Sequence, residues 1–183
     1  MSVSLSLDLT GTITLEKKRG GSLMTIKIGD NLPQGAFTIM TDEGPAPLTI
    51  DELFNGKKVV LFAVPGAFTP GCSISHLPSY LEFADEIFAK KVDTIACMSV
   101  NDSFVMHAWG LDRGVEDKIM MLADGNGDYT RSLGLDNDNS NFGMGIRSKR
   151  FALIAEDGII TELMIEEPGK IAVSKADSIL SKL

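Results

Sequence analysis

Cysteine is scarce in this chain of 183 residues, which contains only Cys72 and Cys97. Two thiols are too few for a disulfide-held scaffold or a four-cysteine zinc site, and such sparse use is typical of a reducing compartment. The two histidines, His76 and His107, add no second ligand at a metal-binding spacing. We therefore expect neither a metal nor a cofactor, and the open question is what the two thiols do.

The chain also lacks long apolar runs and clusters of basic residues. The longest apolar run, Val59–Val64, is far shorter than the roughly 20 residues that span a bilayer. A formal net charge of −8 argues against a surface for nucleic acid. There is no basic start followed by an apolar stretch, as a signal peptide would have. We expect a soluble, cytoplasmic protein that binds neither membrane nor nucleic acid, with organellar targeting by residues 1–23 left open.

Residues 1–23 differ from the rest of the chain. The segment Ser2–Leu15 alternates small polar and apolar residues, which permits an edge strand or a hairpin, and the charged, glycine-rich Glu16–Gly21 follows. Met24 opens a segment that resembles a natural start. The sequence predicts a loosely held extension over 1–23 and one domain over 24–183, long enough to bury a sizeable core.

From residue 24 onward, strand and helix patterns alternate. Apolar runs predict strands over 57–64, 92–100 and 119–123, and a hairpin of 150–155 with 159–165. Four helices are expected. The first spans 70–90 with a kink at Pro78, and the second begins after a cap at Asn101 or Asp102. A short third helix ends at about Leu133, and the last runs from a cap at Ser174 to Leu180. This order predicts an α/β fold, with a mixed central sheet covered by helices on both faces, that is compatible with a thioredoxin-like architecture.

The strand-to-helix turn Pro65–Ser73 reads Pro-Gly-Ala-Phe-Thr-Pro-Gly-Cys-Ser. Cys72 falls at the start of the predicted helix, where unpaired N–H groups and the positive end of the helix dipole favour a thiolate over a thiol. Thr69, three residues earlier, can direct its hydroxyl into the same hollow. We interpret Cys72 as a reactive thiolate; the alternative is a buried structural cysteine at the foot of a helix.

Pro65, Thr69 and Cys72 at this spacing resemble the active-site signature of the peroxiredoxins, and Val64–Ser73 resembles their type II branch. The similarity covers about residues 24 to 183 and continues through Ser99–Met106, Trp109, Leu122–Gly127 and Gly145–Phe151. The resemblance implies a thioredoxin-like fold and a thiol-dependent peroxidase that reduces hydrogen peroxide and small alkyl hydroperoxides. It also implies a homodimer that uses surface near the active-site turn.

The resemblance gives roles to individual residues. Cys72 is expected to be the peroxidatic nucleophile that becomes a sulfenic acid, and Arg150 to favour the thiolate and orient the peroxide. Thr69 is expected to hydrogen-bond the attacked oxygen, and Pro65 to wall the pocket and limit water access. Two further residues are substrate-binding candidates: Gly71 and Arg147. For both arginines, the alternative is ordinary surface charge in a polar loop.

Cys97 lies in an apolar strand pattern, and two interpretations of it stay open. It is either an inert core residue or a resolving thiol that attacks the sulfenic acid to form a disulfide. The resemblance implies the resolving role for a cysteine in this strand. Some animal relatives instead carry their resolving cysteine near the C-terminus, and the matching segment here, Ile171–Ser174, has no thiol. If Cys97 is inert, an external reductant is needed, which by resemblance is glutathione with glutaredoxin, or thioredoxin.

Other functions compete with the peroxidase. The segment Cys72–Ser75 has the spacing of a thioredoxin-like redox motif with its second cysteine replaced by serine, which suggests a monothiol glutaredoxin-like thiol transferase. A non-catalytic redox sensor or thiol-dependent chaperone is a second alternative. Thr69 and Arg150 favour the peroxidase. His76, four residues after Cys72, either tunes the thiolate or is a satisfied structural histidine.

Overall fold

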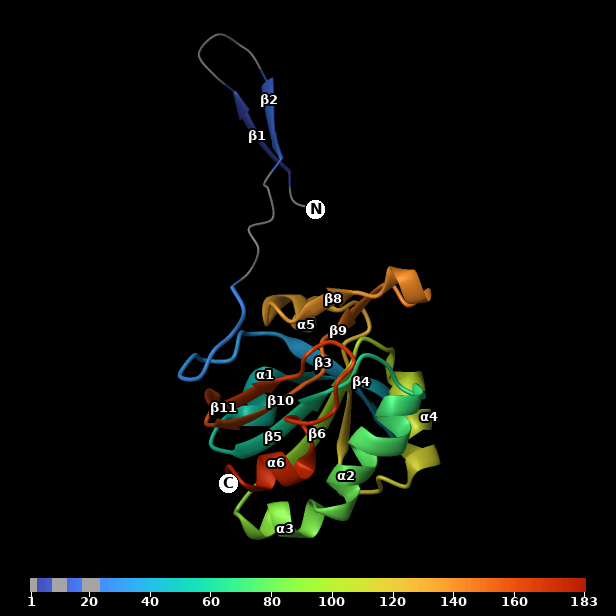
Figure 1. The fold of residues 1–183 in the computed structure, drawn as a ribbon. Coiled ribbons are helices and arrows are strands. Elements are labelled where there is room, and N and C mark those ends of the chain that lie inside the picture. The colour runs from blue at the N-terminus through green and yellow to red at the C-terminus, as the bar shows by residue number, and fades with distance from the viewer. Residues whose placement is uncertain (1–2, 8–12, 18–23) are drawn as a thin grey trace.

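The computed structural model describes residues 3–7, 13–17 and 24–183 (Figure 1). Strands β1 (Val3–Leu7) and β2 (Ile13–Lys17) pair antiparallel, as the alternating pattern near the N-terminus permits. The predicted loose hold of residues 1–23 falls largely outside the described residues. That expectation and the domain boundary at residue 24 stay predictions.

Seven strands form the central sheet, in the order β11-β10-β5-β6-β7-β3-β4. Strands β5, β6 and β7 run parallel, and the other neighbours pair antiparallel. The predicted mixed sheet is therefore confirmed, with two additional strands, β3 and β4, at one side. The strands span Ala36–Thr41 (β3), Gly44–Thr49 (β4), Lys58–Ala63 (β5), Thr94–Ser99 (β6), Met120–Ala123 (β7), Phe151–Glu156 (β10) and Ile159–Ile165 (β11).

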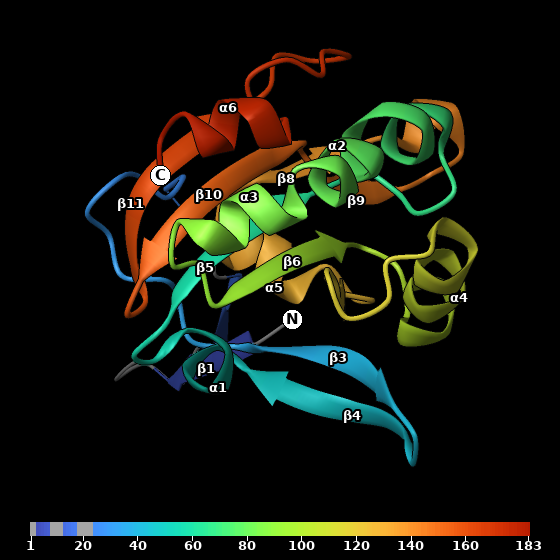
Figure 2. The ribbon, with the colours of Figure 1, turned by 90° about the horizontal axis from the view of Figure 1, so that it is seen from below.

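Helices cover both faces of the sheet, as predicted (Figures 1 and 2). Alternate side chains of β5 point to opposite faces, so Val60 and Phe62 join one apolar core while Val59 and Leu61 join the other. The first core contains residues of α2 (Leu77–Glu82), α3 (Ala84–Ala89), α4 (Ser103–Arg113) and α6 (Ala176–Leu180). The second contains residues of α1 (Ile50–Phe54) and α5 (Asp128–Ser132).

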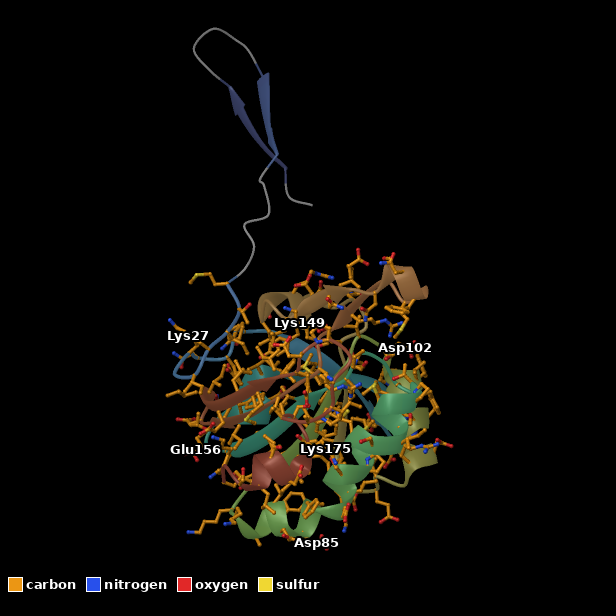
Figure 3. The ribbon with its side chains drawn as sticks, viewed as in Figure 1. Lys27, Asp85, Asp102, Lys149, Glu156 and Lys175 are labelled. Atoms are coloured by element: carbon orange, nitrogen blue, oxygen red, sulfur yellow. The ribbon has the colours of Figure 1, made fainter. Side chains whose placement is uncertain are left out.

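A small two-stranded ribbon of β8 (Asp136–Asp138) and β9 (Ile146–Ser148) lies outside the main sheet. The short 3-10 turn η2 (Ser140–Phe142) lies between its strands. Lys149, labelled in Figure 3, follows β9 and donates its backbone N–H to the carbonyl of Leu135 at 2.8 Å. This bond fixes the chain immediately before Arg150, which leads into β10.

The predicted single helix over 70–90 is interrupted in the structure. A π-helical turn, η1 (Cys72–His76), precedes α2. The helix is interrupted a second time at Phe83, which lies between α2 and α3. Pro78 lies in the first turn of α2, where a missing backbone donor does little harm. The prediction of one helix is therefore wrong, because the π turn and the interruption at Phe83 divide it, and the kink at Pro78 stays a prediction.

The two predicted helix caps have different outcomes. Asp102, labelled in Figure 3, caps α4 by accepting the N–H of Val105 at 2.9 Å, as expected. Ser174 does not cap α6, because the residue at that position is Lys175 and no side chain caps the helix. The hydroxyl of Ser174 donates to the Glu166 carboxylate at 2.8 Å instead.

Candidate active site

Cys72 begins η1, directly after the turn that leaves β5. Within this turn Phe68 has a backbone φ of 59°, a left-handed conformation that a bulky residue rarely adopts. The hydroxyl of Thr69 donates to the carbonyl of Gly66 at 2.9 Å, which tightens the turn. The backbone N–H of Ser73 then bonds the carbonyl of Thr69 at 2.9 Å, so the turn continues into the helix without a gap.

Asn101 ties this turn to the neighbouring strand, a role that the sequence analysis missed. Its side-chain oxygen accepts the backbone N–H of Ala67 at 3.0 Å and the hydroxyl of Ser99 at 2.8 Å. Asn101 follows β6, the parallel neighbour of β5, so the two segments leave the sheet at the same edge. A polar residue directly after the adjacent parallel strand was the signal that points to this contact.

Two hydrogen-bond donors reach the sulfur of Cys72. The Thr69 hydroxyl lies 2.8 Å from Sγ, and the Nη2 of Arg150 lies 3.3 Å from it. The Cys72 side chain is fully buried, so water screens the guanidinium charge beside its sulfur only weakly. The structure thus brings together three residues predicted from the sequence, although two come from one turn and the third, Arg150, directly precedes β10.

His76 contacts the arginine and not the cysteine. Its Nδ1 lies 2.9 Å from Nη1 of Arg150, and its Nε2 lies 2.8 Å from the carbonyl oxygen of Ser174. Burial lowers the pKa of His76 from 6.5 to about 4, so the imidazole is neutral at physiological pH. His76 is therefore buried with both ring nitrogens bonded, and the active-site arginine is one of its partners.

A hollow of about 740 Å³ lies beside the cysteine site, and Arg150 belongs to both. Pro65 and Gly71, both predicted to be near substrate, line this hollow. A Cβ atom added to Gly71 would lie 3.0 Å from Cδ1 of Ile171 and 3.6 Å from Nη2 of Arg150. Glycine at this position therefore leaves space next to the guanidinium. The lining also includes Phe142, Lys149 and Ile171.

Arg147 does not bond the sulfur of Cys72 in the structure. Its Nε donates to the carbonyl of Met144 at 2.8 Å, and its Nη1 donates to the carbonyl of Val100 at 3.0 Å. These bonds join the loop before β9 to the end of β6. Arg147 also borders the active-site turn, because its Nη1 lies 3.4 Å from where a Cβ of Gly66 would be.

Cys97 is a buried free thiol in the centre of the sheet. It lies in β6 opposite Phe62 of β5, and its side chain has no exposed surface. Burial raises the pKa of the Cys97 thiol well above its usual range, and a charge on nearby Cys72 raises it further. Among the described residues, no group of three or more His, Cys, Asp or Glu side chains is arranged to hold a metal.

Comparison with known proteins places this site in context. Residues 27–180 match the redoxin family. The chain is 47% identical over 164 residues to peroxiredoxin-2E-2, chloroplastic, of Oryza sativa subsp. japonica, which covers 87% of this chain and 73% of that protein. It is 44% identical over 159 residues to peroxiredoxin-2B of Arabidopsis thaliana, over 86% of this chain and 98% of that protein. The crystal structure of reduced Prx3 from Vibrio vulnificus in complex with hydrogen peroxide has a TM-score of 0.83 and 49% identity, over 86% and 99% of the two chains.

Proposed function

We propose that this chain, which belongs to the redoxin family and is a type II peroxiredoxin, uses Cys72 as its peroxidatic thiol. The family membership predicted from the sequence is confirmed, and it makes the chain a thiol peroxidase. The observation that supports the role of Cys72 is the convergence of the Thr69 hydroxyl and the Arg150 guanidinium on its buried sulfur. A thiolate nucleophile needs such donors, and so does the oxygen that leaves with negative charge.

The reaction follows from these contacts. The Cys72 thiolate attacks one peroxide oxygen, an S–O bond forms, and the O–O bond breaks with its electron pair on the departing oxygen. The departing oxygen takes a proton and leaves as water or an alcohol, while the sulfur becomes a sulfenic acid. Arg150 stabilises the charge before and after attack, and Thr69 hydrogen-bonds the attacked oxygen. Pro65 and Gly71 shape the approach to the sulfur.

Hydrogen peroxide and small alkyl hydroperoxides are the proposed substrates. A fully buried sulfur favours small substrates, and the adjoining hollow with Phe142 and Ile171 offers apolar surface to an alkyl group. The similar Prx3 of Vibrio vulnificus was solved in complex with hydrogen peroxide, which supports this substrate. Arg147 contributes to binding only through the loop that it holds.

We propose that an external thiol regenerates Cys72. Cys97 is buried and its raised pKa keeps it a thiol, so it is a poor nucleophile toward the sulfenic acid. Glutathione would attack the sulfenic sulfur and release water, and glutaredoxin or a second glutathione would then break the mixed disulfide; thioredoxin is the alternative reductant. Because Cys72 is buried, the π turn must open to admit either thiol.

Reductant-coupled assays test this proposal. Hydrogen peroxide consumption is measured with glutathione and glutaredoxin, with thioredoxin and its reductase, and with no reductant. We expect turnover with at least one system and none in Cys72→Ser. Cleavage of a mixed-disulfide substrate without peroxide consumption would instead indicate the thiol transferase. If both activities are absent, the redox sensor or the chaperone is the alternative that remains.

We also propose a homodimer that uses the surface around the active-site turn. Phe68, Ile74 and Phe104 are 51%, 76% and 65% exposed, which is unusual for large apolar side chains. The bond between Asn101 and Ala67 brings the start of α4 beside the turn, so these residues come from adjoining segments. Light scattering should give twice the chain mass, and Ile74→Lys should give a monomer. A monomeric wild-type protein contradicts this part of the proposal.

A cytoplasmic location is also part of the proposal. In the described part of the chain, no helix is long and apolar enough to cross a membrane. Two of the similar plant proteins are named chloroplastic, so residues 1–23 are the segment to test. Fusing residues 1–23 to a fluorescent protein should leave it in the cytoplasm, and import into an organelle would contradict the proposal.

A further inference from the structure

A closed ring of hydrogen bonds links Arg150 to the segment between β11 and α6. We propose that Glu166 and Ser174 are positioning residues for Arg150, acting through His76, and we call these four residues the arginine latch. The latch deepens the proposed function, because it rests on Arg150 acting at Cys72. Neither Glu166 nor Ser174 hydrogen-bonds the sulfur of Cys72. Glu166 lines the hollow beside Arg150, but its Oε1 bonds Ser174 and Ala172, and the route from there to the sulfur runs through His76 and the guanidinium.

His76 links Arg150 to Ser174, and both of its bonds form in only one tautomer of the neutral ring. A guanidinium has only donors, so Nδ1 of His76 must accept from Nη1 of Arg150 across 2.9 Å. The single proton of the neutral ring is then on Nε2, which donates to the carbonyl of Ser174 across 2.8 Å. The Ser174 carbonyl thus selects the tautomer that leaves Nδ1 free to hold Arg150.

The carbonyl of Ser174 is itself held in place. The hydroxyl of Tyr80 donates to it at 2.7 Å. Oε1 of Glu166 accepts the N–H of Ser174 at 2.9 Å, its hydroxyl at 2.8 Å and the N–H of Ala172 at 2.6 Å. Burial opposes ionisation of Glu166, but these donors outweigh burial and lower its pKa. The carboxylate is therefore charged and organises the loop around it.

The ring closes on the backbone of the arginine. The N–H of Glu166 donates to the carbonyl of Arg150 at 3.0 Å. Its side chain therefore starts beside the backbone of Arg150 and acts, through Ser174 and His76, on the guanidinium of the same residue. Such a ring fixes both ends of a long side chain, which otherwise has several rotatable bonds. A fixed guanidinium loses less entropy when it holds the thiolate or the peroxide.

A purely structural role is the alternative, in which the same bonds only anchor the C-terminal segment. The two roles differ in what a variant changes. An anchor affects the melting temperature and leaves the reactivity of Cys72 unchanged, whereas a latch changes the reactivity as well. Alkylation of Cys72 by iodoacetamide at pH 7 reports the thiolate directly and needs no peroxide or reductant. Using it in a Cys97→Ser background makes Cys72 the only thiol.

Glu166→Ala is the main variant, and Asp177→Ala, on an exposed carboxylate at the start of α6, is its control. We expect Glu166→Ala to slow alkylation and peroxide consumption by about fivefold, the effect of losing about one net hydrogen bond. Glu166→Gln keeps an acceptor oxygen and should recover most of the rate. Asp177→Ala should change neither rate.

A double-mutant cycle separates the latch from an anchor. His76→Asn keeps a short acceptor for Arg150 and cuts the link to Ser174, so adding Glu166→Ala to it should cost no further alkylation rate. An equal loss in both backgrounds, or no loss in either, overturns the latch. If Glu166→Ala does not fold, Ser174→Ala carries the test, with an expected loss of about twofold against no loss in Ser178→Ala. If the latch fails while Cys72→Ser still abolishes peroxide turnover, only the latch is rejected.

Discussion

The hydroxyl oxygen of Thr69 lies 2.8 Å from the sulfur of Cys72 and 2.9 Å from the carbonyl oxygen of Gly66. A hydroxyl has one proton, so it donates to only one of these acceptors at a time. A thiolate is the stronger acceptor because it is charged. Ionisation of Cys72 therefore draws the Thr69 proton to the sulfur, where the attacked oxygen arrives.

Removing this hydroxyl should slow the peroxide reaction. Thr69→Val keeps the shape of the side chain but deletes the donor, and we expect the second-order rate with hydrogen peroxide to fall about a hundredfold. Stopped-flow fluorescence or competition kinetics measures this rate. Thr69→Ser retains the donor and should stay within a few-fold of wild type; an equally slow serine variant contradicts the role of the hydroxyl.

The two arginines near the turn should differ in importance. Arg150→Met deletes the only cation that bonds the Cys72 sulfur among the described residues, so both alkylation at pH 7 and peroxide consumption should fall by at least about tenfold. Arg147→Met deletes bonds to two backbone carbonyls, and the loss should be smaller. Measuring both variants with iodoacetamide and hydrogen peroxide tests this order, and a reversed order contradicts it.

The two cysteines should respond oppositely to the same change. Cys72→Ser removes the nucleophile and should abolish turnover with every reductant. Cys97→Ser replaces a buried thiol and should leave turnover driven by glutathione and glutaredoxin largely intact. Reductant-coupled absorbance assays measure both, and circular dichroism checks the fold. Loss of turnover with all reductants in folded Cys97→Ser would make Cys97 the resolving thiol.

Acid should destabilise the fold through His76. The unfolded histidine has a pKa of 6.5 and the folded one a pKa of about 4, so between these values only the unfolded chain gains the proton. Its contribution to stability is complete above pH 6.5 and is lost as the pH falls to 4, by about 3 kcal/mol in all. Urea unfolding between pH 7 and 4 should show a flatter dependence for His76→Asn than for wild type. The exposed control His107→Asn should retain the wild-type slope, and equal slopes in all three proteins rule out this source.

The central strands were predictable because burial on both faces leaves an apolar signature. The strand β5 reads Lys-Val-Val-Leu-Phe-Ala, and no polar residue interrupts it after Lys58. The strand β4 was missed because it contains Pro45 and Pro47, which ordinarily exclude a strand. It is the last strand of its sheet, where a proline's missing donor leaves no partner unbonded on the open side.

The site was predictable only in part, and the missing part depends on long-range contacts. The turn with Thr69 and Cys72 is local, so its residues could be identified directly. The choice of Arg150 over Arg147 required the resemblance, because sequence distance does not tell which guanidinium reaches a sulfur. Ser174 has the local pattern of a helix cap, but its hydroxyl donates to the Glu166 carboxylate, eight residues earlier and outside any helix.

The π turn at Cys72–His76 has a consequence for the angular placement of the nucleophile. The N–H of Leu77 bonds the carbonyl of Cys72, five residues back, so this turn holds one residue more than an α-helical turn. Each residue of an α-helix rotates the next by about 100° around the axis. If the same residues were wound as regular α-helix, the extra residue would rotate Cys72 by about that angle relative to α2. The direction of the Cys72 side chain relative to α2 therefore depends on the π turn, which accommodates the extra residue.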